Sequence, residues 1–101
     1  TARAADLFRH AFAGDPTAIT RCSSDPKFIA RVEALERSLV PAATAAHPST
    51  DALIAMAASQ ALRGELRDAY LNATTAEAEG DRSRGTAALI TWLRAELRRI
   101  P

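Results

Sequence analysis

The stretch from Ser49 to Glu79 constrains the fold more than any other, because its residue pattern predicts one uninterrupted helix. It contains no proline and a single glycine, Gly64. Ser49 or Thr50 can cap its start, where Asp51 complements the helix dipole. Gly80 then supplies a stop. At 1.5 Å per residue we expect a helix about 45 Å long, more than a small domain needs to cross its own core.

The apolar residues of this stretch occupy two faces of the expected helix. One face comprises Leu53, Met56, Ala57, Gln60, Gly64 and Leu71, and the other comprises Ile54, Ala58, Ala61 and Leu62. A helix that is apolar on two faces must be covered on two sides. Either a second copy of the chain covers the second face, or the long helix packs on the other helices of a single chain. We expect the second copy.

The rest of the chain is divided by helix start and stop signals. A first helix is expected over 3–13, a short second one from Asp15-Pro16, and a third over 27–46 that begins at Ser24-Asp25-Pro26 and contains Pro41. A last helix is expected over 82–100. No segment alternates with period two, so we expect no strand. The sequence thus predicts a single all-α domain over residues 1–101, with about five helices, the last two forming a long antiparallel hairpin.

Small residues are concentrated where the long helix and the last helix would meet. They are Ala57, Ala61, Gly64, Ala69, Gly85, Ala87 and Ala88. Small side chains let helix axes approach closely, and two such hairpins would form a dimeric four-helix bundle. The candidate dimer interface comprises Ile54, Ala58, Ala61, Leu62, Leu89, Trp92 and Leu93.

Composition excludes several classes of partner. The formal net charge is +1, so there is no bulk attraction to nucleic acids or to anionic membranes. No apolar run approaches the length of a membrane span. The lone cysteine, Cys22, excludes an internal disulfide and suits a cytoplasmic protein. The chain begins with Thr1 and not with an initiator methionine, which suits an engineered or proteolytic fragment or one piece of a longer protein.

No pattern of catalytic or metal-ligating residues is present, so we expect neither an enzyme nor a bound metal or cofactor. His10 and His47 lie in different elements without ligand partners at metal-binding spacing. Five arginines make the last helix basic, but we expect them to scatter around it and therefore expect no nucleic-acid contact by this domain. They are Arg82, Arg84, Arg94, Arg98 and Arg99.

The candidate ligand-binding residues are large soft side chains and polar groups in apolar surroundings. They are Phe8, Phe12, Phe28, Met56, Gln60 and Arg63. The aromatic and Met side chains either line a pocket or fill the core. A buried amide must be hydrogen-bonded, so Gln60 faces a cavity or an interface unless it reaches solvent. For Arg63 the solvent-exposed position is favoured.

Three segments resemble TetR-type transcriptional regulators. The run TAITRCSSDPKFIARVEALERSLVPAATAA (17–46) is similar to a stretch in which a short helix ends in a serine-aspartate-proline turn before a longer helix. The segment TDALIAMAASQALRGELRDAYLNA (50–73) resembles the penultimate helix of such regulators, and TAALITWLRAELRRI (86–100) resembles their last helix.

The resemblance implies the C-terminal ligand-binding and dimerisation domain of a bacterial repressor. Its last two helices would form a homodimer, and a small apolar or acyl-type ligand would sit among the preceding helices. DNA would be bound only by an N-terminal helix-turn-helix domain that is absent from these residues. The alternative is a small helical protein–protein interaction module without ligand. A large enclosed apolar cavity would favour the ligand sensor, whereas a filled core with an exposed apolar groove would favour the interaction module.

Overall fold

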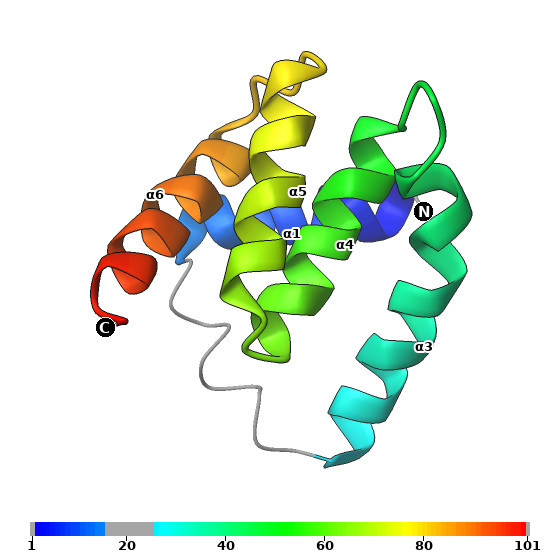
Figure 1. Ribbon diagram of the computed structural model, residues 1–101, viewed down its shortest axis with the longest axis horizontal. Coiled ribbons are helices and arrows are strands. Elements are labelled where there is room, and N and C mark those ends of the chain that lie inside the picture. Colours follow the sequence, from blue (N-terminus) through cyan, green and yellow to red (C-terminus); the bar gives the residue numbers. More distant parts are fainter. Residues whose placement is uncertain (1, 16–25, 101) are drawn as a thin grey trace.

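The computed structural model describes residues 2–15 and 26–100, and over these residues the fold is all-helical, with five helices and no strand. The helices are α1 (Ala2–Gly14), α3 (Pro26–Ala43), α4 (Thr50–Leu62), α5 (Leu66–Ala78) and α6 (Arg84–Arg98) (Figure 1). The prediction of an all-α fold is confirmed. The short helix expected after Pro16, together with Cys22, lies outside the described residues.

Helix α4 is the centre of the fold. Every residue from Ala52 to Leu62 is buried. Helices α1, α3 and α5 pack directly against it, while α6 packs on α1 and α5 (Figure 1). A helix that is apolar all round is stable in water only when it is enclosed on all sides, and here the single chain provides that enclosure.

The expected long helix over 49–79 is wrong, because the chain turns back at Gly64. Gly64 adopts a φ of +79°, and its N–H donates to the Ala61 carbonyl at 3.1 Å. The N–H of Glu65 donates to the Gln60 carbonyl at 2.9 Å. This pair of bonds is the Schellman termination, which requires a left-handed residue just past the helix end and favours glycine there. The one glycine of the stretch is therefore a stop signal rather than a tolerated interior residue.

Helices α4 and α5 consequently form a short antiparallel hairpin (Figure 1). Helix α5 covers a side of α4 that a second copy of the chain was expected to cover. The nominated interface residues Ile54, Ala58, Ala61 and Leu62 lie in the core of one chain, each at most 5% exposed. The need for a second copy, which rested on the uncovered face of a long helix, therefore disappears.

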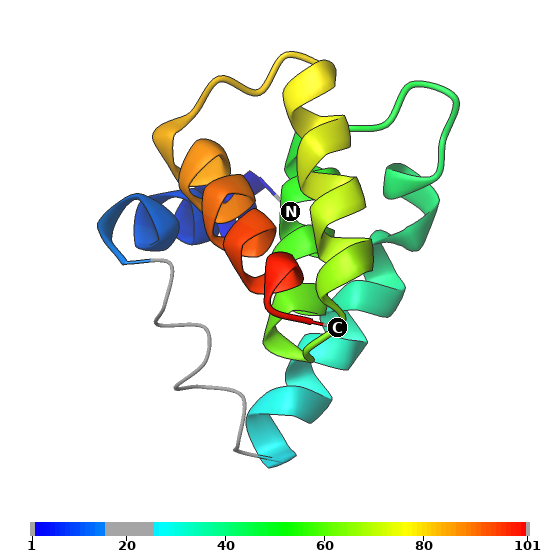
Figure 2. The same cartoon turned by 60° about the vertical axis from the view of Figure 1, so that its left-hand side comes forward.

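Helix α6 lies across α1 (Figure 2). Ser83 caps its start by accepting a hydrogen bond from the Thr86 N–H at 3.3 Å, within two residues of the predicted start at Arg82. Gly85 faces the backbone of Arg9 so closely that a Cβ at this position would overlap the Arg9 carbonyl. Gly85 was expected to lie between the two long helices, and instead it allows α6 to cross α1 closely.

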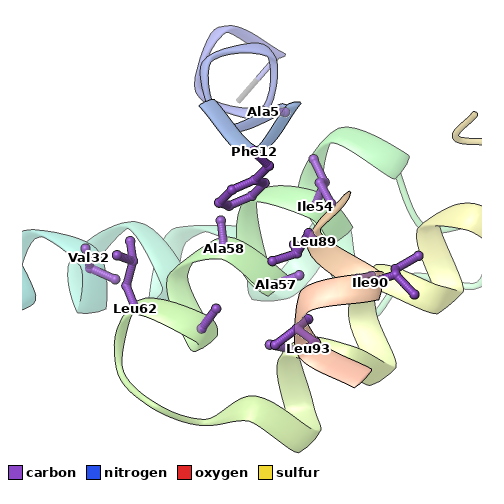
Figure 3. Packing of buried hydrophobic residues seen from close by; sticks show 13 residues of the cluster. Ala5, Phe12, Val32, Ile54, Ala57, Ala58, Leu62, Leu89, Ile90 and Leu93 are labelled. Atoms are coloured by element: carbon purple, nitrogen blue, oxygen red, sulfur yellow. The ribbon is translucent and has the colours of Figure 1, made fainter. Parts of the chain in front are cut away.

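The main core cluster joins all five described helices (Figure 3). Phe12 of α1 points toward Ala58 of α4, and Leu89 of α6 lies beside Ala57 (Figure 3). A second cluster joins Leu39 of α3 to Met56 of α4. Helix α3 continues past Pro41 and ends at Ala43 rather than at the expected residue 46.

Candidate functional site

The four apolar ligand candidates contribute to the core. Phe12 and Met56 are 3% and 5% exposed. Phe8 and Phe28 are half-buried and pack against the main cluster. Phe8 and Phe12 also stack, with ring centroids 6.1 Å apart and planes inclined by 12°. Of the two alternatives left open by the sequence, packing in the core describes these side chains.

Gln60 has its hydrogen-bond partner inside the chain. The Asn72 side-chain amide donates to its Oε1 at 2.7 Å, which links α4 to α5. The residue is 9% exposed, so a buried polar group is satisfied without a ligand or a second chain. Asn72 was not nominated, because only the turn at Gly64 brings it opposite Gln60.

Arg63 is half-buried, with its side chain 22% exposed, and is paired with carboxylates. Its Nε and Nη2 donate to the two carboxylate oxygens of Glu36 at 2.7 Å each, and Nη2 also reaches Glu65 at 3.0 Å. This fork joins the end of α4 to α3. The hydrogen bond with Glu36 is the main reason that the pKa of Arg63 is raised. The arginine therefore has a structural role that its position in the sequence did not reveal.

Two shallow depressions flank this end of the molecule, and both are open to solvent. The smaller has a volume of about 150 Å³. It is lined by Glu33, Glu36, Arg37, Val40 and Arg63. The larger, about 320 Å³, lies between the α4–α5 turn and the end of α6. It is lined by Gly64, Glu65, Leu66, Arg67, Asp68, Leu97 and Ile100. Neither has a phenylalanine in its lining.

A second arginine, Arg9, holds three segments together at the other end of α4. Its guanidinium contacts Asp51 at 2.6 Å, Asp81 at 2.9 Å and Asp6 at 3.2 Å. These aspartates come from α4, the α5–α6 corner and α1 itself. The sequence did not predict this cluster, because its members converge only when α1 crosses α6.

Asp81 is the buried member of this cluster, with its side chain 4% exposed. It accepts hydrogen bonds from the Thr86 hydroxyl at 2.8 Å and the Ser83 N–H at 3.0 Å, as well as from Arg9. Burial favours the neutral carboxyl, but these hydrogen bonds outweigh it and lower the pKa of Asp81. The charged form of Asp81 therefore stabilises the fold.

The remaining dimer candidates lie on the core side of α6, and three of the five arginines expected on the last helix lie on its solvent side. Leu89 and Leu93 are buried in the core, and Trp92 is half-buried against it. The expectation that the arginines scatter is only partly right. Arg99 pairs with Glu96 at 3.1 Å, and Arg82 donates to the Glu77 carbonyl. The other three, Arg84, Arg94 and Arg98, are exposed on one face.

The described residues offer no further built site. Among them, no buried side-chain nitrogen or oxygen lacks a hydrogen-bond partner. In the same residues, no group of three His, Cys, Asp or Glu side chains is placed to hold a metal. No described helix is long and apolar enough to cross a membrane. No protein-family model matches the chain, and no curated protein and no solved structure matches it either. The similarity to TetR-type regulators thus stays a prediction.

Proposed function

We propose that this chain is a helical protein–protein interaction module whose core is complete without a ligand. The observation that supports the proposal is the enclosure of α4, which is buried from Ala52 to Leu62 by helices of its own chain. The polar groups nominated as ligand contacts, Gln60 and Arg63, are paired with Asn72 and Glu36. Among the described residues, the polar groups expected to contact an effector are thus engaged within the chain, which favours external functional surfaces.

The surface offers several places where a partner can bind. Leu7 of α1 and Leu71 of α5 are each 63% exposed, and Val40 and Ile100 are each 45% exposed. These residues lie on different elements, and single exposed apolar side chains are common on proteins. Position-specific cross-linking is therefore needed to find the face that is used.

A first experiment asks whether the core takes a ligand. Native mass spectrometry of the purified protein and thermal unfolding with dodecanoyl-CoA distinguish the alternatives. The interaction module predicts a mass without a small-molecule adduct and a melting temperature that does not change with the acyl compound. A retained small molecule, or stabilisation that rises with acyl-CoA concentration as mass action requires, would contradict it.

A second experiment asks whether one face binds a partner. A photo-cross-linking amino acid is placed separately at Leu7, Leu71 and Thr91, which are exposed on α1, α5 and α6. We expect a discrete adduct with one identified protein from one face and none from the others when the protein is irradiated in cells of its source organism. Absence of an adduct from every position would contradict the interaction function.

The second candidate is the effector-binding and homodimerisation domain of a TetR-like transcriptional repressor. The observation that favours it is that α6, which holds most of the segment resembling the family's last helix, packs beside α5, which holds the end of the segment resembling the penultimate helix. A dimer would then use their outer faces. A small apolar or acyl-type ligand would enter beside the half-buried Phe8 and Phe28. DNA would be bound through an N-terminal domain outside these residues. A dimer carrying a small extra mass is the result expected from this candidate.

A further inference from the structure

The solvent face of α6 has an unusual composition. We define the α6 arginine face as the exposed residues at three- and four-residue spacing: Arg84, Ala87, Thr91, Arg94, Ala95 and Arg98. At 3.6 residues per turn they fall within an arc of about 100°, opposite the buried Leu89 and Leu93. The face contains cations and small residues and no carboxylate.

The three arginines of this face differ from the paired Arg9, Arg63 and Arg99, and unlike the other exposed, unpaired arginines of the described residues they lie together on one helix face without a carboxylate. Within the described residues, Arg84, Arg94 and Arg98 have no ion-pair or hydrogen-bond partner. The carboxylates of Asp51, Asp81, Glu36 and Glu96 instead pair with Arg9, Arg63 and Arg99. Internal pairing thus withdraws acidic groups from the surface and leaves α6 with a local positive potential, although the chain as a whole is nearly neutral.

The side chains in the middle of the face are small, so the surface there lies close to the helix backbone. Ala87 and Ala95 present one methyl group each, and the Thr91 hydroxyl donates to the Ala87 carbonyl of its own helix at 3.0 Å. Small side chains let a second helix approach to about 8 Å between axes. Along the axis, Arg94 lies about 15 Å from Arg84 and about 6 Å from Arg98. A helix lying alongside would meet these arginines with side chains at the same helical spacing.

We propose that the α6 arginine face binds an acidic helix of a partner protein. The proposal rests on the interaction function proposed above and specifies its partner. We infer that the partner is acidic from charge complementarity, because three unpaired guanidinium groups favour carboxylates at helical spacing. The small residues at the centre of the face favour a helix as the partner, because a second helix can approach them closely. Nucleic acid is the poorer match, because the face carries no aromatic side chain for stacking and the net charge is only +1.

Binding of a defined peptide tests the proposal directly. The probe is a fluorescein-labelled, alanine-based peptide of 18 residues with glutamates at three- and four-residue spacing along one side. Its twin carries glutamine at the same positions. Fluorescence anisotropy is measured with the whole chain at low and at physiological ionic strength. We expect the glutamate peptide to bind and the glutamine peptide to bind at least tenfold more weakly.

Two charge-matched variants locate the surface. Arg94→Glu alters the α6 arginine face, whereas Arg31→Glu alters an exposed position of α3. Each changes the net charge by the same amount, and circular dichroism melts check that both remain folded. We expect Arg94→Glu to weaken binding of the glutamate peptide by about tenfold, and Arg31→Glu to change it by less than about twofold. Equal weakening by the two variants would overturn the proposal, because it would indicate attraction by overall charge.

Other outcomes also overturn the proposal. A 20-base-pair DNA duplex that binds more tightly than the peptide would make nucleic acid the partner. Self-association that Arg94→Glu abolishes would make a second copy of the chain the partner. Absence of peptide binding together with a discrete cross-link from Leu7 or Leu71 would exclude the α6 arginine face as the binding surface but would support the interaction function. Absence of both would remove the interaction function as well.

Discussion

Arg9 and Arg63 are each surrounded by carboxylates, yet they connect very different amounts of structure. Arg63 joins α4 to the neighbouring α3 through Glu36, whose side chain is 16% exposed. Arg9 joins α1, α4 and the α5–α6 corner, and its partner Asp81 is 4% exposed. We therefore expect an arginine–carboxylate pair to contribute more to stability where it is buried and where it joins segments that are distant in the sequence. The comparison can be tested by breaking each cluster in turn.

The largest effect is expected at the helix crossing that positions Arg9. In Gly85→Ala the new Cβ would overlap the Arg9 backbone, which cannot move without lifting α1 off α6. We expect a loss of about 3 kcal/mol in the free energy of unfolding, measured by urea titration. Gly14→Ala is the matched control, because nothing lies within 4 Å of a Cβ there. If both variants were equally stable, the close crossing of α1 and α6 would be wrong.

Removal of the buried charge is expected to have the next largest effect. Asp81→Asn keeps the shape of the side chain but weakens its bonds to Arg9, Ser83 and Thr86. We expect a loss of about 2 kcal/mol in chemical unfolding. Asp6→Asn is the control on the same guanidinium, because Asp6 is 76% exposed. It should cost only about 0.3 kcal/mol, and a similar loss from both would show that burial does not distinguish the two partners.

At the Arg63 cluster we expect a smaller loss in the free energy of unfolding. Glu36→Gln removes the charge from the fork with Arg63 while solvent and Glu65 remain available to the guanidinium. The expected loss in the free energy of unfolding is about 1 kcal/mol. Glu79→Gln changes an exposed carboxylate at the end of α5 and should cause no loss. A greater loss from Glu36→Gln than from Asp81→Asn would reverse the ranking of the clusters.

The pH dependence sharpens the comparison further. The pKa of Asp81 is lowered in the folded state, so its charge stabilises the fold above the unfolded pKa of about 3.9. That contribution is lost as the pH falls through the lower folded value. We therefore expect the stability advantage of the wild type over Asp81→Asn to be constant near neutral pH and to shrink below about pH 4. Urea unfolding across this range measures it, and an advantage that persisted at the lowest pH would mean that the charge is not its source.

Local signals predicted much of the secondary structure. The last helix was expected over 82–100 and is found as Arg84–Arg98, because Ser83 is a good cap. The helix expected over 49–79 failed for a local reason too. Gly64 and the charged pair around it could be interpreted as helix interior or as a Schellman stop, and only the positive φ distinguishes them.

The polar clusters were beyond sequence reasoning for a different reason. Arg9 lies 42 residues from Asp51 and 72 residues from Asp81, so no periodicity connects them. Gln60 and Asn72 meet only because the chain reverses between them. The ligand candidates were chosen for being large or polar in apolar surroundings, and a core residue satisfies the same description. Amphipathicity alone cannot separate a pocket from a filled interior.

The crossing of α1 and α6 also has a consequence for synthesis on the ribosome. Helices α3, α4 and α5 follow one another and can begin to associate while the chain is still growing. Helix α1 is made early, but the partner that fixes Arg9 is made 72 residues later. Until α6 has emerged, α1 and α5 lack the helix that packs against both of them. The nascent domain therefore keeps apolar surface exposed, and stays prone to aggregation and to chaperone binding, until α6 has been made.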